Sequence, residues 1–214
     1  MRIGVLALQG DFALHARALA RCGRGEAGHQ SVIEVVEVRK PEQLDDLDGL
    51  VIPGGESTTL LKLMEAGGFG PALETFHAVG KPIFGTCAGL ILLAREVTSP
   101  AQVSLGLMDV GVERNAYGRQ RESFEAAGTA QLDGRSVPIE MVFIRAPRIR
   151  RVGQGVATLA RHGDETVMAR QGTILAATFH PELTDDPTIH RYFCRMVAEA
   201  RRGSSSTTTA RRSP

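Results

Sequence analysis

The sequence predicts a three-layer α/β fold with a mostly parallel central sheet, helices on both faces, and added antiparallel strands in the second half. Three observations predict this fold. Short apolar runs alternate with helix-like segments through the first half of the chain, which is typical of parallel strands linked by helices. Short strand-like runs separated by turn residues fill most of the second half. The length of 214 residues, with 43% hydrophobic and 23% charged residues, is typical of one folded domain and untypical of a disordered or coiled-coil chain.

The elements of the first half follow from apolar periodicity. Residues 2–8 form an apolar run that is too short for most helices and typical of a strand covered on both faces. A helix is expected from about residue 12, where apolar residues recur at helical spacing and Asp11 can cap the first turn. Further strands are expected at 32–38, 50–52 and 82–85. Further helices are expected from Ser57 (which can cap its own helix), over 71–79, and from Cys87 to Ala94.

The second half predicts antiparallel pairs, because its short strands are separated by turns such as Asp133-Gly134 and Gln171-Gly172. These strands are expected at 108–114, 139–144, 155–160, 165–170 and 173–179. A last helix is expected to start at Asp186-Pro187 and to end at about Ala200. Residues 201–214 are low in complexity and cannot offset the entropy of ordering. We therefore expect one domain over 1–200 and a disordered tail over 201–214.

Charge and cysteine content argue against several classes of function. Four of the 25 basic residues lie in the last fourteen, so residues 1–200 carry 21 basic and 24 acidic groups and offer no general attraction for nucleic acid. No apolar run approaches the roughly 18 residues of a membrane helix, and the first residues lack a secretory leader, so a cytoplasmic protein is expected. Three widely spaced cysteines fit neither a disulfide framework nor a zinc cluster, and no metal is expected.

One cysteine lies at the turn between a predicted strand and a predicted helix. The segment Gly85-Thr86-Cys87-Ala88-Gly89 has the pattern Gly-x-Cys-x-Gly, the thiol counterpart of the Gly-x-Ser-x-Gly elbow. Such a turn raises the central side chain above the sheet in a strained conformation, and its glycines leave room for the chain reversal. The positive end of the helix favours the reactive thiolate. Cys87 is therefore the candidate nucleophile, with a small buried structural cysteine as the alternative.

His180 and Glu182 are a candidate base and the acid that orients it. Residues two apart in an extended segment point the same way, and Pro181 favours extended geometry at the residue before it. Glu182 would then hold one ring nitrogen of His180 while the other nitrogen takes the thiol proton. A lone His-x-Glu pattern is more often a surface pair, but together with the Cys87 elbow it predicts a catalytic triad.

A second glycine turn, Pro53-Gly54-Gly55, ends a predicted strand. The missing Cβ atoms let backbone N–H groups approach a ligand there. An N–H of Gly54 or Gly55, together with that of Ala88, would form an oxyanion hole for an acyl-transfer intermediate. A tight turn followed by a helix cap at Ser57 is the alternative interpretation.

Six segments resemble, in chain order, the glutaminase subunits of pyridoxal 5′-phosphate synthase, which are class I, triad-type glutamine amidotransferases. The segments are IGVLALQG, LVIPGGEST, GTCAGL, ERNAYGRQRESFE, FIRAP and FHPELT, and the resemblance spans about residues 2–198. It implies the flavodoxin-like sheet of class I glutaminases. It also implies hydrolysis of L-glutamine to L-glutamate and ammonia without a cofactor, and passage of the ammonia to a synthase subunit that makes pyridoxal 5′-phosphate.

The resemblance also implies roles for individual residues. Cys87 matches the nucleophile of the family, and His180 and Glu182 match its charge-relay pair. The residues implied to contact glutamine are Gly55, Glu56, Ser57, Arg114, Ile144 and Arg145. Free glutamine needs donors for its carboxylate and an acceptor for its ammonium, which arginines and Glu56 can supply. Which arginine meets the carboxylate stays open, and surface ion pairs or a first-turn helix acid are the alternatives for these charged residues.

Family members are little active alone and gain activity when the synthase docks, as a Pro-Gly peptide reorients to complete the oxyanion hole. The resemblance thus implies a hetero-oligomer, with no nucleic acid or membrane involved. Gln9, Gly10 and the helix carrying His15 would contribute to its interface, although His15 as an ordinary residue of an amphipathic helix is the stronger interpretation. Residues 24–30 lengthen the loop after the first helix, and the tail has no family counterpart.

Three rival functions remain. The peptidase and deglycase group shares a cysteine elbow but places a histidine directly after the cysteine, where Ala88 stands here. The glutaminase of imidazole glycerol phosphate synthase lacks the Gly-Glu-Ser-Thr stretch. A regulatory subunit with a vestigial site is disfavoured because the cysteine, histidine and glutamate are all present.

Overall fold

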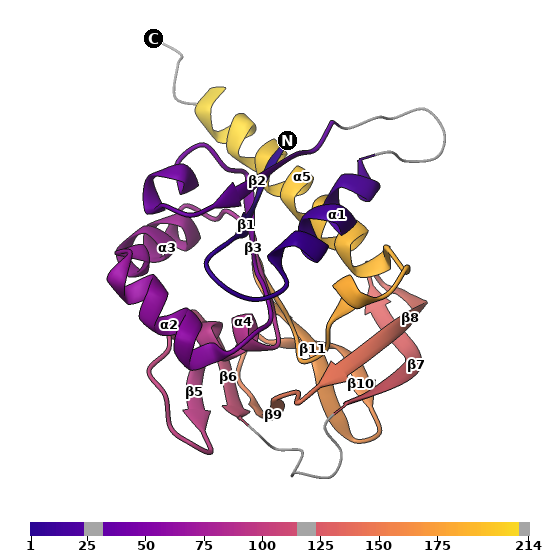
Figure 1. Cartoon of the computed structure of the whole chain (residues 1–214). Coiled ribbons are helices and arrows are strands. Elements are labelled where there is room, and N and C mark those ends of the chain that lie inside the picture. The colour runs from indigo at the N-terminus through magenta and orange to yellow at the C-terminus, as the bar shows by residue number, and fades with distance from the viewer. Residues whose placement is uncertain (24–31, 115–122, 210–214) are drawn as a thin grey trace.

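The chain forms an α/β structure around one curved sheet (Figure 1). The structure is a computed structural model of the chain and describes residues 1–23, 32–114 and 123–209. The strands are β1 (Arg2–Leu6), β2 (Glu34–Val38), β3 (Gly49–Ile52), β4 (Ile83–Thr86), β5 (Ala94–Thr98), β6 (Met108–Glu113), β7 (Ser123–Leu132), β8 (Arg135–Ile144), β9 (Arg148–Val152), β10 (Ala157–His162), β11 (Glu165–Gln171) and β12 (Ile174–Ala177). The helices are α1 (Phe12–Cys22), α2 (Ser57–Ala66), α3 (Phe69–Ala78), α4 (Ala88–Leu93) and α5 (Thr188–Thr209), with short 3₁₀ turns at Pro41–Leu44 and Pro181–Leu183.

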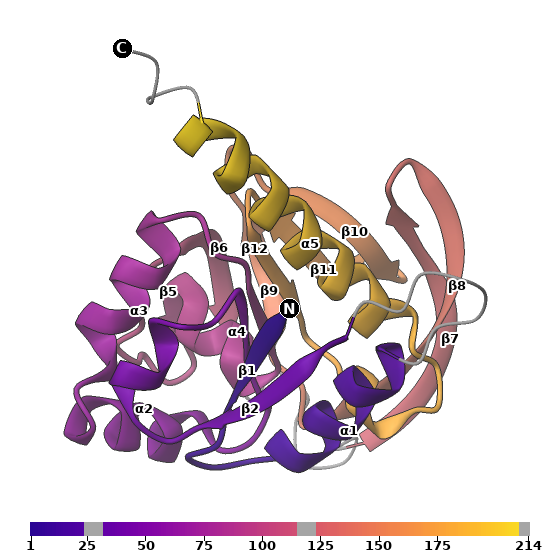
Figure 2. The same cartoon turned by 90° about the horizontal axis from the view of Figure 1, so that it is seen from above.

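A parallel sheet in the order β2-β1-β3-β4-β12 forms the centre of the molecule. Helices α1 and α5 cover one face, and α2, α3 and α4 cover the other (Figure 2). Ile3 and Val5 of β1 pack on the first side and Leu6 on the second, all at 0% exposure. Burial on both faces explains why β1, β3, β4 and β12 are largely apolar in the sequence, whereas the edge strand β2 carries Glu34 and Glu37. The predicted three-layer fold is confirmed.

The second half adds antiparallel pairs, as predicted. β11 pairs with β12, β10 with β11, and β7 with β8, all antiparallel. A branch of β5, β6 and β9 joins the sheet through β9 and β11. Strand β12 has a double role, because it is antiparallel to β11 on one side and parallel to β4 on the other.

Three strands were missed by the sequence analysis. β7 contains Gly128 and several alanines, which have low strand propensity, and a long ladder with β8 stabilises it instead. β9 is rich in arginine, and its Arg150 and Arg151 pair with acids of neighbouring strands. β5 takes the place of the expected end of a helix, because the chain leaves α4 at Leu93 and pairs with β6. Such pairings join residues that are distant in the chain, so they are hard to recognise from the hydrophobic pattern of the strand itself.

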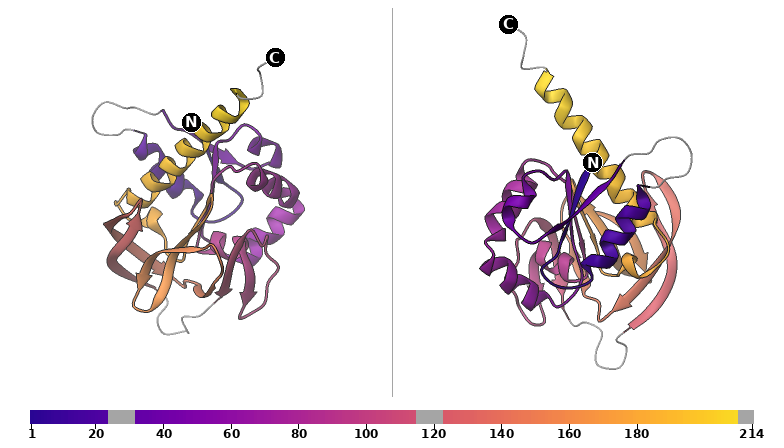
Figure 3. Two further views of the ribbon diagram at one scale, coloured as in Figure 1. Left: turned by 180° about the vertical axis from the view of Figure 1, so that it is seen from behind. Right: turned by 45° about the horizontal axis from the view of Figure 1, so that its top comes forward.

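The last helix, α5, ends later than predicted. It continues to Thr209 rather than Ala200, so residues 201–209, expected to lie in the disordered tail, have helical backbone. Arg201 supports this continuation, because its Nε lies 3.2 Å from Oδ1 of Asp48. Figure 3 shows the far end of α5 projecting beyond the sheet. The predicted loop extension at 24–30 and residues 210–214 lie outside the described residues. In the described part of the chain, no helix is both long enough and apolar enough to cross a membrane.

Candidate active site

Cys87 lies between β4 and α4 in the expected sharp turn. Its backbone has φ 47° and ψ −101°, a strained conformation for a residue with a side chain. Its N–H donates to the carbonyl oxygen of Ala177 in β12, at 2.9 Å, which holds the turn in place. The flanking glycines are needed for space, since a Cβ on Gly89 would overlap the carbonyl oxygen of Ile52. The elbow predicted from the sequence is therefore present.

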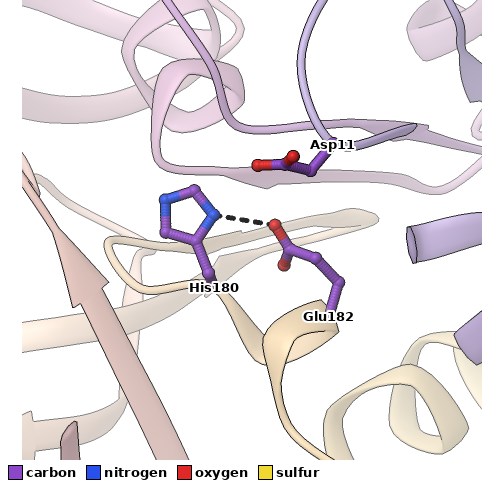
Figure 4. Close-up of side chains that lie close together, drawn as sticks. All are labelled: Asp11, His180 and Glu182. Atoms are coloured by element: carbon purple, nitrogen blue, oxygen red, sulfur yellow. Dashed lines mark hydrogen bonds and ion pairs between the residues drawn. The ribbon is translucent and has the colours of Figure 1, made fainter. Parts of the chain in front are cut away.

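His180 follows β12, the parallel neighbour of β4, and so reaches the Cys87 turn from the adjacent strand end. Its N–H donates to the carbonyl oxygen of Val142 at 2.8 Å. Its Nδ1 donates to Oε1 of Glu182 at 2.7 Å (Figure 4). The local geometry differs from the expected extended segment, because Pro181 starts a 3₁₀ turn and Glu182 reaches the ring from within that turn.

The electrostatics of this pair favour a charged imidazole. Burial alone would lower the pKa of His180, but hydrogen bonds to Cys87 and Glu182 and their negative charges outweigh it and raise the pKa to about 10. Burial alone would raise the pKa of Glu182, but the neighbouring His15 and His180 rings hold it well below its usual range. A buried carboxylate thus faces an imidazole that prefers to keep its proton.

A cavity of about 240 Å³ opens in front of Cys87 and His180. All six residues expected to contact glutamine line it. The complete lining is Asp11, Gly55, Glu56, Ser57, Cys87, Ile91, Arg114, Ile144, Arg145, Pro147 and His180. The structure thereby brings together residues that are up to 169 positions apart in the chain, namely Asp11 and His180.

Glu56, not Ser57, caps α2. Its carboxylate accepts hydrogen bonds from the N–H groups of Thr58 at 3.0 Å and Thr59 at 2.7 Å. These bonds outweigh partial burial and lower the pKa of Glu56 to about 2, so it stays ionised. Ser57 is instead the first residue of the helix, and its hydroxyl donates to Gln102 at 3.0 Å. The predicted cap was therefore wrong by one residue, since a carboxylate one position earlier reaches the same N–H groups.

The two arginines that line the cavity lie in different environments. Arg114 is mostly buried, donates to the hydroxyl of Thr58 at 2.9 Å and lies 3.6 Å from Oε1 of Glu56. Arg145 is exposed and has φ 41°, a left-handed backbone that is strained for arginine. Its neighbour Ile144 is 38% exposed and ends β8.

The Pro53-Gly54-Gly55 turn is clamped between the loop after β1 and the His180 ring. A Cβ on Gly54 would overlap Cε1 of His180, and a Cβ on Gly10 would overlap the carbonyl oxygen of Gly54. Gln9 supports the turn from the same loop, because its Oε1 accepts from the N–H of Glu56 at 3.0 Å. Neither Gly54 nor Ala88, both expected in the oxyanion hole, is among the residues that line the cavity, whereas Gly55 is.

Sequence reasoning did not assign Asp11, Gln9 or Gly10 to the catalytic site. Asp11 was expected to cap α1 but makes no side-chain cap bond, and its carboxylate instead points toward His180 and Glu182 (Figure 4). Atoms of Asp11, His180 and Glu182 that could bind a metal ion lie within 4.8 Å of one another. Since His180 Nδ1 and Glu182 Oε1 already bond each other, we assign no metal to this group. A usable signal existed, because ligands bind beyond the carboxyl ends of parallel strands, and this loop directly follows β1.

His15 lies on the buried face of α1. It is 0% exposed, and its ring points into the protein toward Thr86, Glu182 and His190. Its side chain is therefore not part of an exposed docking surface.

Comparisons with known proteins agree with this geometry. The model of the SNO glutamine amidotransferase family matches residues 5–199. The chain is 52% identical over 205 residues to the pyridoxal 5′-phosphate synthase subunit PdxT of Geobacillus kaustophilus (strain HTA426), covering 96% of this chain and 99% of the relative. It is 55% identical over 201 residues to PdxT of Pelotomaculum thermopropionicum (strain DSM 13744 / JCM 10971 / SI), covering 94% and 97%.

Solved structures resemble the chain as well. A crystal structure of a glutamine amidotransferase superposes with a TM-score of 0.81 at 48% identity, over 92% of this chain and 98% of that one. The structure of PurLQS from Thermotoga maritima shares the fold, with a TM-score of 0.62 at 14% identity, over 93% of this chain and 95% of that one.

Proposed function

This chain belongs to the SNO glutamine amidotransferase family, and from that premise we propose that Cys87, His180 and Glu182 are its catalytic triad. The protein hydrolyses L-glutamine and supplies the ammonia for pyridoxal 5′-phosphate synthesis. One observation supports the triad most directly. A strained elbow cysteine and a histidine held by a buried carboxylate line the same cavity.

The reaction starts with an ion pair. His180 takes the proton of the Cys87 thiol, and the thiolate so formed attacks the side-chain carbonyl carbon of glutamine. The carbonyl oxygen becomes an oxyanion, which backbone N–H groups of Gly54 or Gly55 and of Ala88 would stabilise. His180 then protonates the leaving nitrogen, ammonia departs, and a γ-glutamyl thioester remains on Cys87.

Water completes the cycle. His180, now neutral, takes a proton from a water molecule that attacks the thioester, and glutamate and the Cys87 thiolate are released. Glu182 stays ionised throughout and keeps the proton of His180 on Nδ1, so that Nε2 faces the reacting atoms. The triad thus works as a positioned base whose tautomer is set by a carboxylate.

The cavity supplies complementary charges for free glutamine. The ionised Glu56 is an acceptor for the ammonium group, and Arg114 or Arg145 is a donor for the carboxylate. Ser57, Gly55 and Ile144 complete the walls. This arrangement selects a free amino acid over a peptide, because a peptide lacks one or both of these charges.

A synthase subunit would complete the machinery. The relatives named above are subunits of pyridoxal 5′-phosphate synthase, and we place this chain in a corresponding hetero-oligomer that involves neither nucleic acid nor membrane. The Gly54 peptide, packed between Gly10 and His180, is the segment that would reorient on docking. The free chain should therefore turn over glutamine slowly and accelerate when synthase is added. Full activity of the free chain, unchanged by synthase, would contradict this proposal.

Covalent labelling tests the nucleophile. We expect a glutamine-like diazo ketone to inactivate the chain in the presence of synthase and to leave one adduct on the peptide containing Cys87. Cys22 and Cys194 serve as internal controls, because neither lines the cavity. An adduct elsewhere would reject the assignment, and no adduct at all would favour a regulatory subunit with a vestigial site.

A further inference from the structure

A second set of buried polar groups lies behind the triad. His15 of α1 and His190 of α5 are each 0% exposed; His15 contacts the carboxylate of Glu182, and His190 contacts His15. Nε2 of His15 lies 3.2 Å from Oε2 of Glu182 and 3.0 Å from Oγ1 of Thr86, the residue before the nucleophile. Nδ1 of His15 lies 3.0 Å from Nε2 of His190. A continuous line of contacts therefore runs from the reacting centre through Glu182 to α5.

The contacts determine where the protons are. A bare Nε2 on His15 would set a lone pair against a carboxylate oxygen 3.2 Å away, so Nε2 carries a proton. Oγ1 of Thr86 accepts this proton at 3.0 Å, and Oε2 of Glu182 lies beside it without a hydrogen bond of its own among the described residues. Nδ1 of His15 and Nε2 of His190 lie 3.0 Å apart and share one proton between them. Burial lowers the pKa of His190 to about 3, so this ring is neutral. Its Nδ1 has no hydrogen-bond partner among the described residues, as suits a bare acceptor better than an N–H.

We propose that His15, backed by His190, is a positioning residue of the triad: its Nε2–H, 3.2 Å from Oε2 of Glu182, attracts that oxygen electrostatically and so aims Oε1 at His180. This inference rests on the proposed function, because the triad is its premise. A carboxylate held at one oxygen by His180 alone could rotate about its side-chain bonds. The second contact, on the other oxygen, fixes both the position and the plane of the group.

Packing alone does not account for these residues. Burying a polar ring costs free energy unless it is hydrogen-bonded, and an apolar side chain would fill the same space without that cost. The groups that face Glu182 are His15 from α1, His180 from its own turn, and Asp11 from the loop before α1. Of these three, His15 is the one that contacts Oε2.

Two variants separate positioning from packing. In His15→Gln, the amide nitrogen can occupy the place of Nε2 and still donate to Glu182. In His15→Asn, the shorter side chain reaches only the place of Nδ1, so the contact with Glu182 is lost. With synthase present, we expect His15→Asn to lower kcat about 10- to 100-fold, as for the loss of a hydrogen bond to a charged group, with KM nearly unchanged. His15→Gln should retain most of the activity.

A measurement that does not depend on glutamine hydrolysis separates the positioning role of His15 from the proposed glutaminase triad. The rate of Cys87 alkylation by iodoacetamide, followed by mass spectrometry of its peptide, should shift to higher pH in His15→Asn and stay in place in His15→Gln. Equal losses in both variants, or losses that follow thermal stability, would overturn the positioning role while leaving the glutaminase function intact. A ¹⁵N NMR spectrum of the unmodified chain showing His15 protonated on Nδ1 and bare at Nε2 would overturn it as well.

Discussion

Replacing Glu182 by Gln tests the triad most sharply, because the change keeps the size of the side chain and removes its charge. The structure leaves the new amide no good orientation. With its oxygen toward His180, its NH₂ group faces Nε2–H of His15, 3.2 Å from the present Oε2. With its oxygen toward His15, the NH₂ group faces Nδ1 of His180 and forces the proton to the wrong nitrogen. The first orientation therefore sets two donors against each other, and the second gives His180 the wrong tautomer.

The size of the effect follows from the electrostatics of His180. Its pKa is raised from 6.5 to about 10, a preference for the charged ring on the order of 5 kcal/mol. Cys87 and Glu182 share this stabilisation, so losing one partner costs on the order of 2 kcal/mol, or about 30-fold in rate. The wrong tautomer adds to this loss, and in a comparable Ser-His-Asp triad the equivalent change costs about 10⁴-fold. We therefore expect kcat to fall by about 10² to 10⁴.

The assay is glutamate release in the presence of synthase, with thermal unfolding to verify that the variant is folded. Glu125→Gln is a matched control, because Glu125 is an exposed carboxylate of β7 and does not line the catalytic cavity. This control should behave as the unmodified chain does. A Glu182→Gln variant whose kcat stays within a few-fold of the unmodified protein would remove Glu182 from the mechanism.

Three further outcomes are expected. Cys87→Ala should abolish glutamine hydrolysis but leave synthase docking and the use of free ammonium by the complex, as measured by pyridoxal 5′-phosphate formation; retained hydrolysis would reject Cys87. Because the folded-state pKa of His180 lies above 6.5, stabilisation by its charged ring is present below pH 6.5 and is lost as the pH rises toward about 10. Urea unfolding should show this loss, and a His180→Asn variant should lack it. Gly54→Ala would push a Cβ against the His180 ring and should lower kcat about 100-fold. Gly70→Ala, whose Cβ would meet nothing within 4 Å, should leave kcat unchanged.

Local patterns predicted much of the central fold. The strands β1, β3 and β4 are largely apolar runs because both of their faces are buried, and this property is visible in a few consecutive residues. The elbow around Cys87 was equally visible as a motif of five consecutive residues, although the space that Gly89 leaves is taken by the carbonyl group of Ile52 in β3. Strands such as β7 and β9 escaped prediction because their stability comes from pairing partners rather than from their own residues.

As with the fold, part of the candidate site could be predicted from short sequence motifs and part depends on contacts between distant segments. The residues of the proposed triad could be chosen from two short motifs, because each motif carries its own geometric reason. The clamp of Gly10 on Gly54, the approach of Asp11 to His180 and the contact of His15 with Glu182 join segments that are 44 to 169 positions apart. Such contacts depend on how the strand ends and helices pack together. The residues of the proposed triad can be recognised from their neighbours in the sequence. The contacts that hold those residues in place form only when the parallel strands bring their carboxyl ends to one edge of the sheet.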